Sequence, residues 1–255
     1  MGHQRTGTLP QTDRWREVVD QLSDFSTSDT DVSEIAQRVA ENVKSRLKNM
    51  HLDSGVQATF QFLVQLTVAA RSHDPVRKLN QMGIELPPNP SPLKISLALR
   101  KWAGQKITEK DSMEYMELAA SAATDTIMER YERASGTQSK MFGEESSLDT
   151  WGDVSGGEFS EVAHSYFANF TERYLRYFLD REASSEIRDL DTREVFQEKI
   201  AQHAREKAKI TQSFAAGWYN KHASESPPSN EEVEGFLYKA FGKLRGELSR
   251  EEYDE

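Results

Sequence analysis

One pair of residues has the spacing of a metal-binding motif. Glu161 and His164 form a Glu-x-x-His sequence in a segment of helical periodicity, which would place a carboxylate and an imidazole on one helix face. Helical di-metal enzymes use two such motifs and two further glutamates, whereas this sequence has no second Glu-x-x-His. Other helical segments offer carboxylates in principle, at Glu114, Glu117, Glu194 and Glu198. We therefore predict no metal site and place a di-metal enzyme third among the candidate functions.

Other sequence signatures of catalysis are missing. The chain has no phosphate-binding loop ending in Lys-Ser or Lys-Thr, no dinucleotide fingerprint, no HExxH and no GxSxG. It has no cysteine, which excludes a thiol nucleophile, a disulfide framework and an iron-sulfur cluster. The four acidic residues Glu144, Glu145, Asp149 and Asp153 do not match the spacing of a calcium-binding loop. We predict a protein that is not an enzyme, with no catalytic residues and no cofactor.

One segment is basic in an otherwise acidic chain. The net charge is −10, yet residues 71–110 carry more Lys and Arg than Asp and Glu. A helix near Trp102 could bury its apolar side and present cations outward, with the indole available for stacking on a base. This predicts, as the alternative function, a nucleic-acid-binding protein that uses Arg71, Arg77, Lys78, Lys94, Arg100, Lys101 and Lys106.

Two other interpretations of the basic segment stay open. It can be a solvated helix face that pairs with the acidic half of the same chain, and the overall negative charge opposes the binding of a polyanion. The basic segment of one copy can also meet the acidic C-terminal half of another copy, giving head-to-tail association that weakens as salt rises.

Aromatic residues concentrate between residues 158 and 183. Aromatic residues at helical spacing usually belong to a hydrophobic core. These aromatics, however, cover more of the helix circumference than packing against one neighbouring helix requires. This favours a surface for a partner protein or for self-association. Trp151 lies in a segment that we expect to be a polar loop. Tryptophans in such loops often dock onto a neighbouring surface. We therefore predict a non-enzymatic interaction or scaffold subunit of a larger assembly, with a partner-binding site at Phe159, Tyr166, Phe167, Phe170, Tyr174, Tyr177 and Trp151.

The elements that must position these residues are helices. Apolar residues recur at steps of three and four, and the apolar run 56–70 suits a helix buried in a bundle better than the alternative of a strand. No segment predicts a sheet, so the expected fold is an all-α bundle of about eight or nine helices. We expect helices near residues 15–22, 31–50, 56–70, 93–103, 108–134, 158–183, 192–222 and 230–248, with Phe214 and Trp218 among the apolar residues of the seventh.

Two non-helical segments divide the predicted bundle. Residues 83–92 hold four of the eight prolines and predict a stiff connector within an N-terminal lobe, 1–134. Residues 135–157 predict a long acidic, glycine-rich loop that joins this lobe to a C-terminal lobe, 158–255, which carries the aromatic residues. Only 36% of the chain is hydrophobic and no apolar run approaches the length of a membrane span, so we expect a cytoplasmic protein without a membrane partner.

Overall fold

The computed structural model describes residues 12–25, 32–107, 113–135, 148–187, 189–223 and 226–249. Within these ranges every regular element is helical and no strand occurs, which confirms the predicted all-α, multi-helix fold. No helix in them is both long enough and apolar enough to cross a membrane. Lys110, Glu144, Glu145 and most of the predicted loop 135–157 lie outside the described residues.

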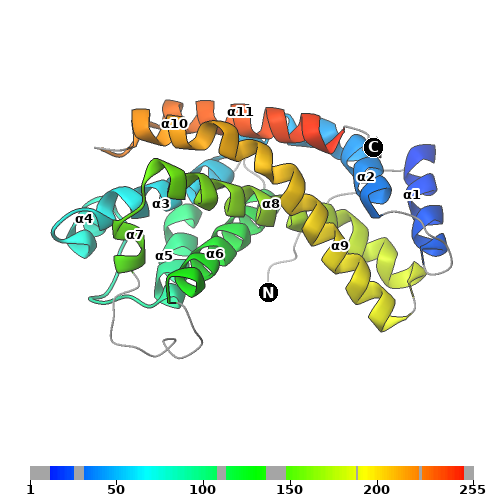
Figure 1. Cartoon of the computed structure of the whole chain (residues 1–255), viewed down its shortest axis with the longest axis horizontal. Helices are drawn as coiled ribbons and strands as arrows, with labels where there is room; N and C mark the ends of the chain where they lie inside the picture. Colours follow the sequence, from blue (N-terminus) through cyan, green and yellow to red (C-terminus); the bar gives the residue numbers. More distant parts are fainter. Residues whose placement is uncertain are drawn as a thin grey trace.

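The helices follow one another along the whole described chain (Figure 1). Two short 3-10 turns, η1 at Met50–Leu52 and η3 at Lys209–Thr211, stand between them. The α-helices are α1 Asp13–Asp24, α2 Val32–Leu47, α3 Ser54–Ala70, α4 Pro75–Gln81, α5 Pro92–Gly104, α6 Met113–Ser135, α7 Asp149–Gly152, α8 Gly156–Glu186, α9 Leu190–Ala208, α10 Gln212–His222 and α11 Asn230–Leu248.

Side-chain caps explain where several helices begin. The Asp53 carboxylate accepts hydrogen bonds from two free amides in the first turn of α3, both at 3.0 Å. Ser155 and Ser229 begin α8 and α11 with capping boxes, in which a serine hydroxyl and a glutamate three residues later satisfy each other's backbone amides. These caps fix the starts of the longest helix and of the last one.

The structure divides the predicted helix 192–222 into two. The chain turns through η3, where the Thr211 hydroxyl donates a 2.7 Å hydrogen bond to the carbonyl of Ala208. In Figure 1, α9 rises along α8 from the lower right, and after η3 the chain continues as α10 in the upper layer near α11. Another difference is α7, a single helical turn within the segment predicted as a loop.

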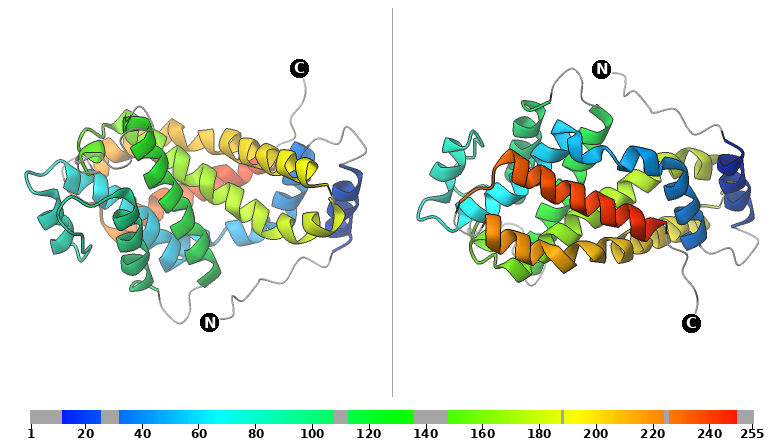
Figure 2. Two further views of the ribbon diagram at one scale, coloured as in Figure 1. Left: turned by 90° about the horizontal axis from the view of Figure 1, so that it is seen from below. Right: turned by 90° about the horizontal axis from the view of Figure 1, so that it is seen from above.

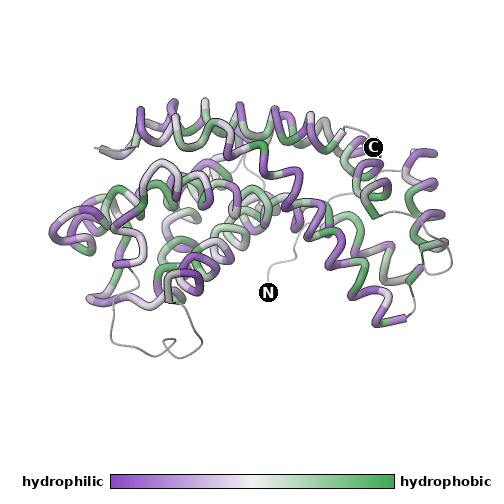
Figure 3. The backbone as a smooth tube through the Cα atoms, in the orientation of Figure 1, coloured by the Kyte–Doolittle hydropathy of each residue, from purple (hydrophilic) through white to green (hydrophobic). Residues whose placement is uncertain are grey.

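The core is continuous across the boundary predicted between the two lobes. The long helix α8 packs against α6, α9 and α10, and α3 lies against α5, α6 and α11. Figure 2 shows α9 running alongside α8. Buried residues from both halves, such as Phe62 and Phe170, belong to one hydrophobic cluster. Figure 3 shows hydrophilic and hydrophobic positions alternating along the helices, as expected of amphipathic elements packed on one core.

Candidate partner-binding groove

The aromatic residues of α8, predicted as a partner surface, lie in the core. Phe159, Tyr166, Phe167 and Phe170 are fully buried, Tyr174 is 1% exposed, and the half-buried Tyr177 packs against the same core. Rings of other helices cover them, because Phe60 of α3 lies 5.3 Å from Tyr166 and Phe241 of α11 lies 5.3 Å from Phe170, centre to centre. These rings therefore pack against several helices at once, and all of them except the half-buried Tyr177 are closed to a partner.

The buried phenol of Tyr166 has an internal partner. Its hydroxyl lies 3.0 Å from the hydroxyl of Thr59, a residue of α3. Burial raises the pKa of Tyr166 well above its usual range, so the phenol stays neutral at physiological pH. Trp151 is likewise 1% exposed and stacks under the guanidinium of Arg130, 5.4 Å from the ring centre. Both side chains hold helices together.

Three cations of the basic segment, Arg71, Arg100 and Lys101, are engaged by other groups of the protein. Arg71 donates to the carbonyl of Val154 at 2.6 Å and to the hydroxyl of Tyr219. Arg100 donates to the carboxylate of Glu117 at 2.8 Å, and Lys101 pairs with Glu85 at 2.5 Å. Lys101 holds the pKa of the Glu85 carboxyl below its usual value through this hydrogen bond.

Trp102, predicted as a stacking platform, is not accessible. Its ring is 4% exposed, its indole N–H donates to the carbonyl of Met82 at 3.3 Å, and the ammonium of Lys106 lies 5.1 Å from its centre. Within the described residues, the cations of the segment that make no hydrogen bond or ion pair through their side chains are Arg77, Lys78, Lys94 and Lys106, the last of which contacts only the Trp102 ring.

Glu161 and His164 point to different partners. The carboxylate of Glu161 accepts a 2.8 Å hydrogen bond from the amide of Gln212, and Nε2 of His164 lies 2.8 Å from the backbone carbonyl oxygen of Arg205. Among the residues that the structure describes, no three histidine, aspartate or glutamate side chains come together as metal ligands.

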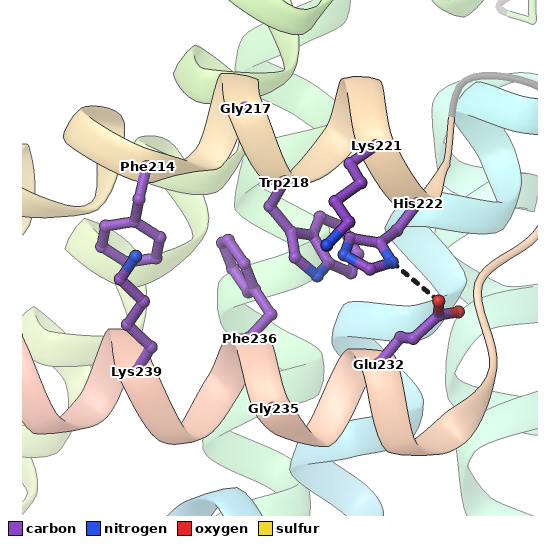
Figure 4. Close-up of a pocket in the computed structure, with 9 residues that line it drawn as sticks. All are labelled: Phe214, Gly217, Trp218, Lys221, His222, Glu232, Gly235, Phe236 and Lys239. Atoms are coloured by element: carbon purple, nitrogen blue, oxygen red, sulfur yellow. Dashed lines mark hydrogen bonds and ion pairs between the residues drawn. The ribbon is translucent and has the colours of Figure 1, made fainter.

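Among the residues that the structure describes, α10 and α11 form an accessible groove between them. It has a volume of about 560 Å³ and its walls are the facing sides of the two helices (Figure 4). Three aromatic rings line it: Phe236 is 2% exposed at the base, and the half-buried Phe214 and Trp218 stand along the α10 side. The ring centres of Trp218 and Phe236 are 4.7 Å apart, and those of Phe214 and Phe236 are 5.3 Å apart.

Charged side chains surround this aromatic surface. The ammonium of Lys239 lies 4.6 Å from the centre of the Phe214 ring, and Lys221 extends over the opposite part of the groove (Figure 4). At the end near Lys221, Nδ1 of His222 lies 2.7 Å from a carboxylate oxygen of Glu232. The Ser229 amide and His222 together lower the pKa of that carboxyl, so it is ionised at neutral pH.

A glycine on each wall keeps the groove open. Gly217 lies on α10 and Gly235 on α11, and both belong to the groove lining (Figure 4). A Cβ atom built at either position would meet no atom within 4 Å. Because neither glycine has a side chain, the backbone of a bound segment can approach both helices closely.

The groove brings together residues that the sequence analysis placed on separate helices. Phe214 and Trp218 were predicted as core residues of one helix, and their incomplete burial depends on how α10 and α11 pack. The available signal was a glycine next to an aromatic residue within a helical segment, at Gly217–Trp218 and Gly235–Phe236. Glycine is costly inside a helix, so its presence beside an aromatic indicates a need for space.

Comparisons with known proteins place the chain in no family: no protein-family model, curated protein or solved structure matches it.

Proposed function

We propose that this chain is a non-enzymatic binding protein that docks an amphipathic helical segment of a partner protein in the groove between α10 and α11. The observation that carries the proposal is the row of three aromatic rings, two of them incompletely covered, between glycines that leave both walls open. Helices that bind in grooves insert apolar residues spaced three or four apart. Partly exposed aromatic side chains are the usual anchors of such interfaces.

The charges of the groove favour a peptide over a nucleic acid. Lys221 and Lys239 would pair with acidic side chains that flank the apolar anchors of the partner. Glu232, and Glu231 beside it, would repel a phosphate backbone at the same end, and the chain as a whole carries a charge of −10. The proposed occupant is therefore an amphipathic helix that places acidic side chains against Lys221 and Lys239 and none against Glu231 and Glu232.

The experiment uses a photo-crosslinking amino acid placed in the groove of the full chain inside its native cells. Position 217 is suitable because a side chain there has open space, and position 246 on α11 is a matched control with the same freedom. Crosslinked residues of a partner are then mapped by mass spectrometry, and a synthetic peptide of the mapped segment is titrated against the purified protein.

The proposal expects a crosslink from position 217 and none to the same partner from position 246. The mapped peptide should bind the wild-type chain, and Gly235→Trp, which fills the groove, should weaken binding at least tenfold. Lys239→Glu should also weaken binding of an acidic peptide, whereas Lys243→Glu, one turn further along α11, should not. A mapped segment without apolar residues at helical spacing, or a peptide that binds Gly235→Trp normally, would refute the proposal.

A further inference from the structure

Two helix faces hold most of the large apolar side chains that are exposed on the described surface. On α5, Leu93 is 63% exposed and Leu97 is 52% exposed. On α9, Leu190 is 73% exposed and Val195 is 46% exposed. Exposed apolar side chains that lie together on one face, unlike single ones, mark interaction surfaces. The described residues contain two others of this kind, Leu52 and Tyr238.

The exposed face of α5 is apolar and basic. Leu93 and Leu97 are one helical turn apart, and the exposed Lys94 and Lys101 lie on the same side of the helix, with Lys101 in a surface ion pair with the exposed Glu85. The side chain of Lys94 makes no hydrogen bond or ion pair with any described residue. Gly104 continues this face one to two turns further and has open space around it, so a second helix can approach closely there.

The exposed face of α9 is apolar and acidic. Leu190 and Val195 are five residues apart, so they lie about 140° apart around α9, and Asp191, Glu194 and Glu198 fall on the arc between them. All five residues are exposed. Within the described part of the chain, none of these three carboxylates takes part in a hydrogen bond or an ion pair. The first two turns of α9 therefore present the complement of the α5 face, with the same apolar character and the opposite charge.

We propose that the α5 face of one copy of this chain packs against the α9 face of a second copy. The two faces cannot meet within one molecule, because α5 lies toward one end of the long axis and the start of α9 toward the other (Figures 1 and 2). Pairing them between copies covers the exposed leucines of α5 with the arc of α9 between Leu190 and Val195. It also places Lys94 among carboxylates that make no hydrogen bond or ion pair with the residues the structure describes.

Such a contact joins two different surfaces, so it leaves one free α5 face and one free α9 face on every pair. Contacts of this kind continue into rings or filaments rather than stopping at a symmetric dimer. A single pair of helices gives a contact at the small end of the range of specific interfaces, so the association depends strongly on concentration. The surface is separate from the α10–α11 groove, and the inference does not rest on the function proposed for that groove.

The test is sedimentation of the full chain at increasing concentration, with two complementary charge-reversal variants. In the first variant, Lys94→Glu and Lys101→Glu make the α5 face acidic. In the second, Glu194→Lys and Glu198→Lys make the α9 face basic. Each variant alone presents two faces of the same sign, whereas an equimolar mixture again pairs an acidic face with a basic one at every contact. Lys243→Glu, at an exposed lysine of α11, is the control for negative charge added away from both faces.

The wild-type chain and Lys243→Glu should form species larger than a monomer as concentration rises, and should dissociate when salt is raised from about 0.05 M to about 0.5 M. Each double variant should need at least tenfold more protein to associate, and mixing the two should restore association. All changes are at exposed positions, so circular dichroism should show unchanged folding. A wild-type chain that stays monomeric, or double variants that associate as the wild type does, would overturn the inference.

Discussion

The ammonium group of Lys239 lies 4.6 Å from the centre of the Phe214 ring, so a cation of α11 covers an aromatic side chain of α10. Cation–π contacts at exposed sites contribute about 0.5–1 kcal/mol. Lys239→Met keeps the length of the side chain but removes its charge, so we expect the free energy of unfolding in urea to fall by about 0.5–1 kcal/mol. In a double-mutant cycle with Phe214→Leu, the two losses should be less than additive.

The matched control for this substitution is Lys243→Met. Lys243 is exposed on the same helix one turn further on and lies over no aromatic ring among the described residues. Its replacement is expected to change the free energy of unfolding by less than about 0.5 kcal/mol. Equal losses from the two lysine substitutions would show that the contact with Phe214 contributes nothing of its own.

Trp218 is the tryptophan that solvent can reach. The chain has four tryptophans, and Trp15, Trp102 and Trp151 are 4%, 4% and 1% exposed, whereas Trp218 is half-buried in the groove. Acrylamide should therefore quench one component of the native fluorescence, and Trp218→Phe should abolish that component and shift the remaining emission to shorter wavelength. Trp102→Phe should leave the quenchable component intact. Quenching that persists at full amplitude in Trp218→Phe would contradict the described groove.

Two glycines should respond in opposite ways to replacement by alanine. A Cβ atom at Gly55, in the first turn of α3, would lie 2.6 Å from the Cβ atom of Met116, which is only 6% exposed. Relieving that overlap requires α3 or α6 to shift, so Gly55→Ala should lower the free energy of unfolding by about 1–3 kcal/mol. Gly242, inside α11, has open space, and Gly242→Ala should raise it by about 0.5–1 kcal/mol because alanine favours helix.

Denaturation in urea measures both changes on the same scale. The comparison controls for helix propensity, because the alanine is the same and the two glycines differ in what surrounds them. If Gly55→Ala proved as stabilising as Gly242→Ala, the close approach of α3 to α6 would be wrong.

The fold was largely predictable because helical periodicity is a local property. Apolar residues three and four positions apart predict a helix at 31–50, and the structure has α2 there. The apolar run 56–70 predicts a buried helix, and α3 is buried on nearly all sides. The break at Ala208 was not predictable in this way, because the apolar pattern continues through it to Phe214 and Trp218. At this break the chain forms the 3-10 turn η3, in which Thr211 is fully buried and its hydroxyl donates to the carbonyl of Ala208.

The candidate site was harder to predict because exposure depends on tertiary packing. Phe170 and Trp218 have the same pattern in the sequence, an aromatic at helical spacing, yet the first is fully buried and the second lines a groove. The partners of charged side chains also depend on tertiary packing. Lys94 and Arg100 are both cations of one basic segment, but of the two only Arg100 pairs with a carboxylate, that of Glu117 on α6. Sequence periodicity predicts which helix carries a side chain, and the neighbouring helix determines what that side chain meets.

The capping box at the start of α11 should make stability depend on acid pH. The Ser229 amide donates to the Glu232 carboxylate at 2.8 Å, and His222 lies 2.7 Å from its other oxygen. These contacts lower the pKa of Glu232 below its ordinary value of 4.5. A carboxyl whose pKa is lower in the folded state stabilises the protein fully above its unfolded pKa, and this contribution is lost as the pH falls through the folded pKa.

Glu232→Gln tests this contribution directly, because glutamine can occupy the same position of a capping box but does not titrate. The wild-type chain should be the more stable of the two at pH 6, and the difference in their free energies of unfolding should shrink as the pH falls below 4.5. Glu231→Gln, which also removes one negative charge from the first turn of α11, should retain the pH dependence of the wild type. A difference between wild type and Glu232→Gln that stays constant down to acid pH would mean that the carboxylate of Glu232 is not held by Ser229 and His222 in solution.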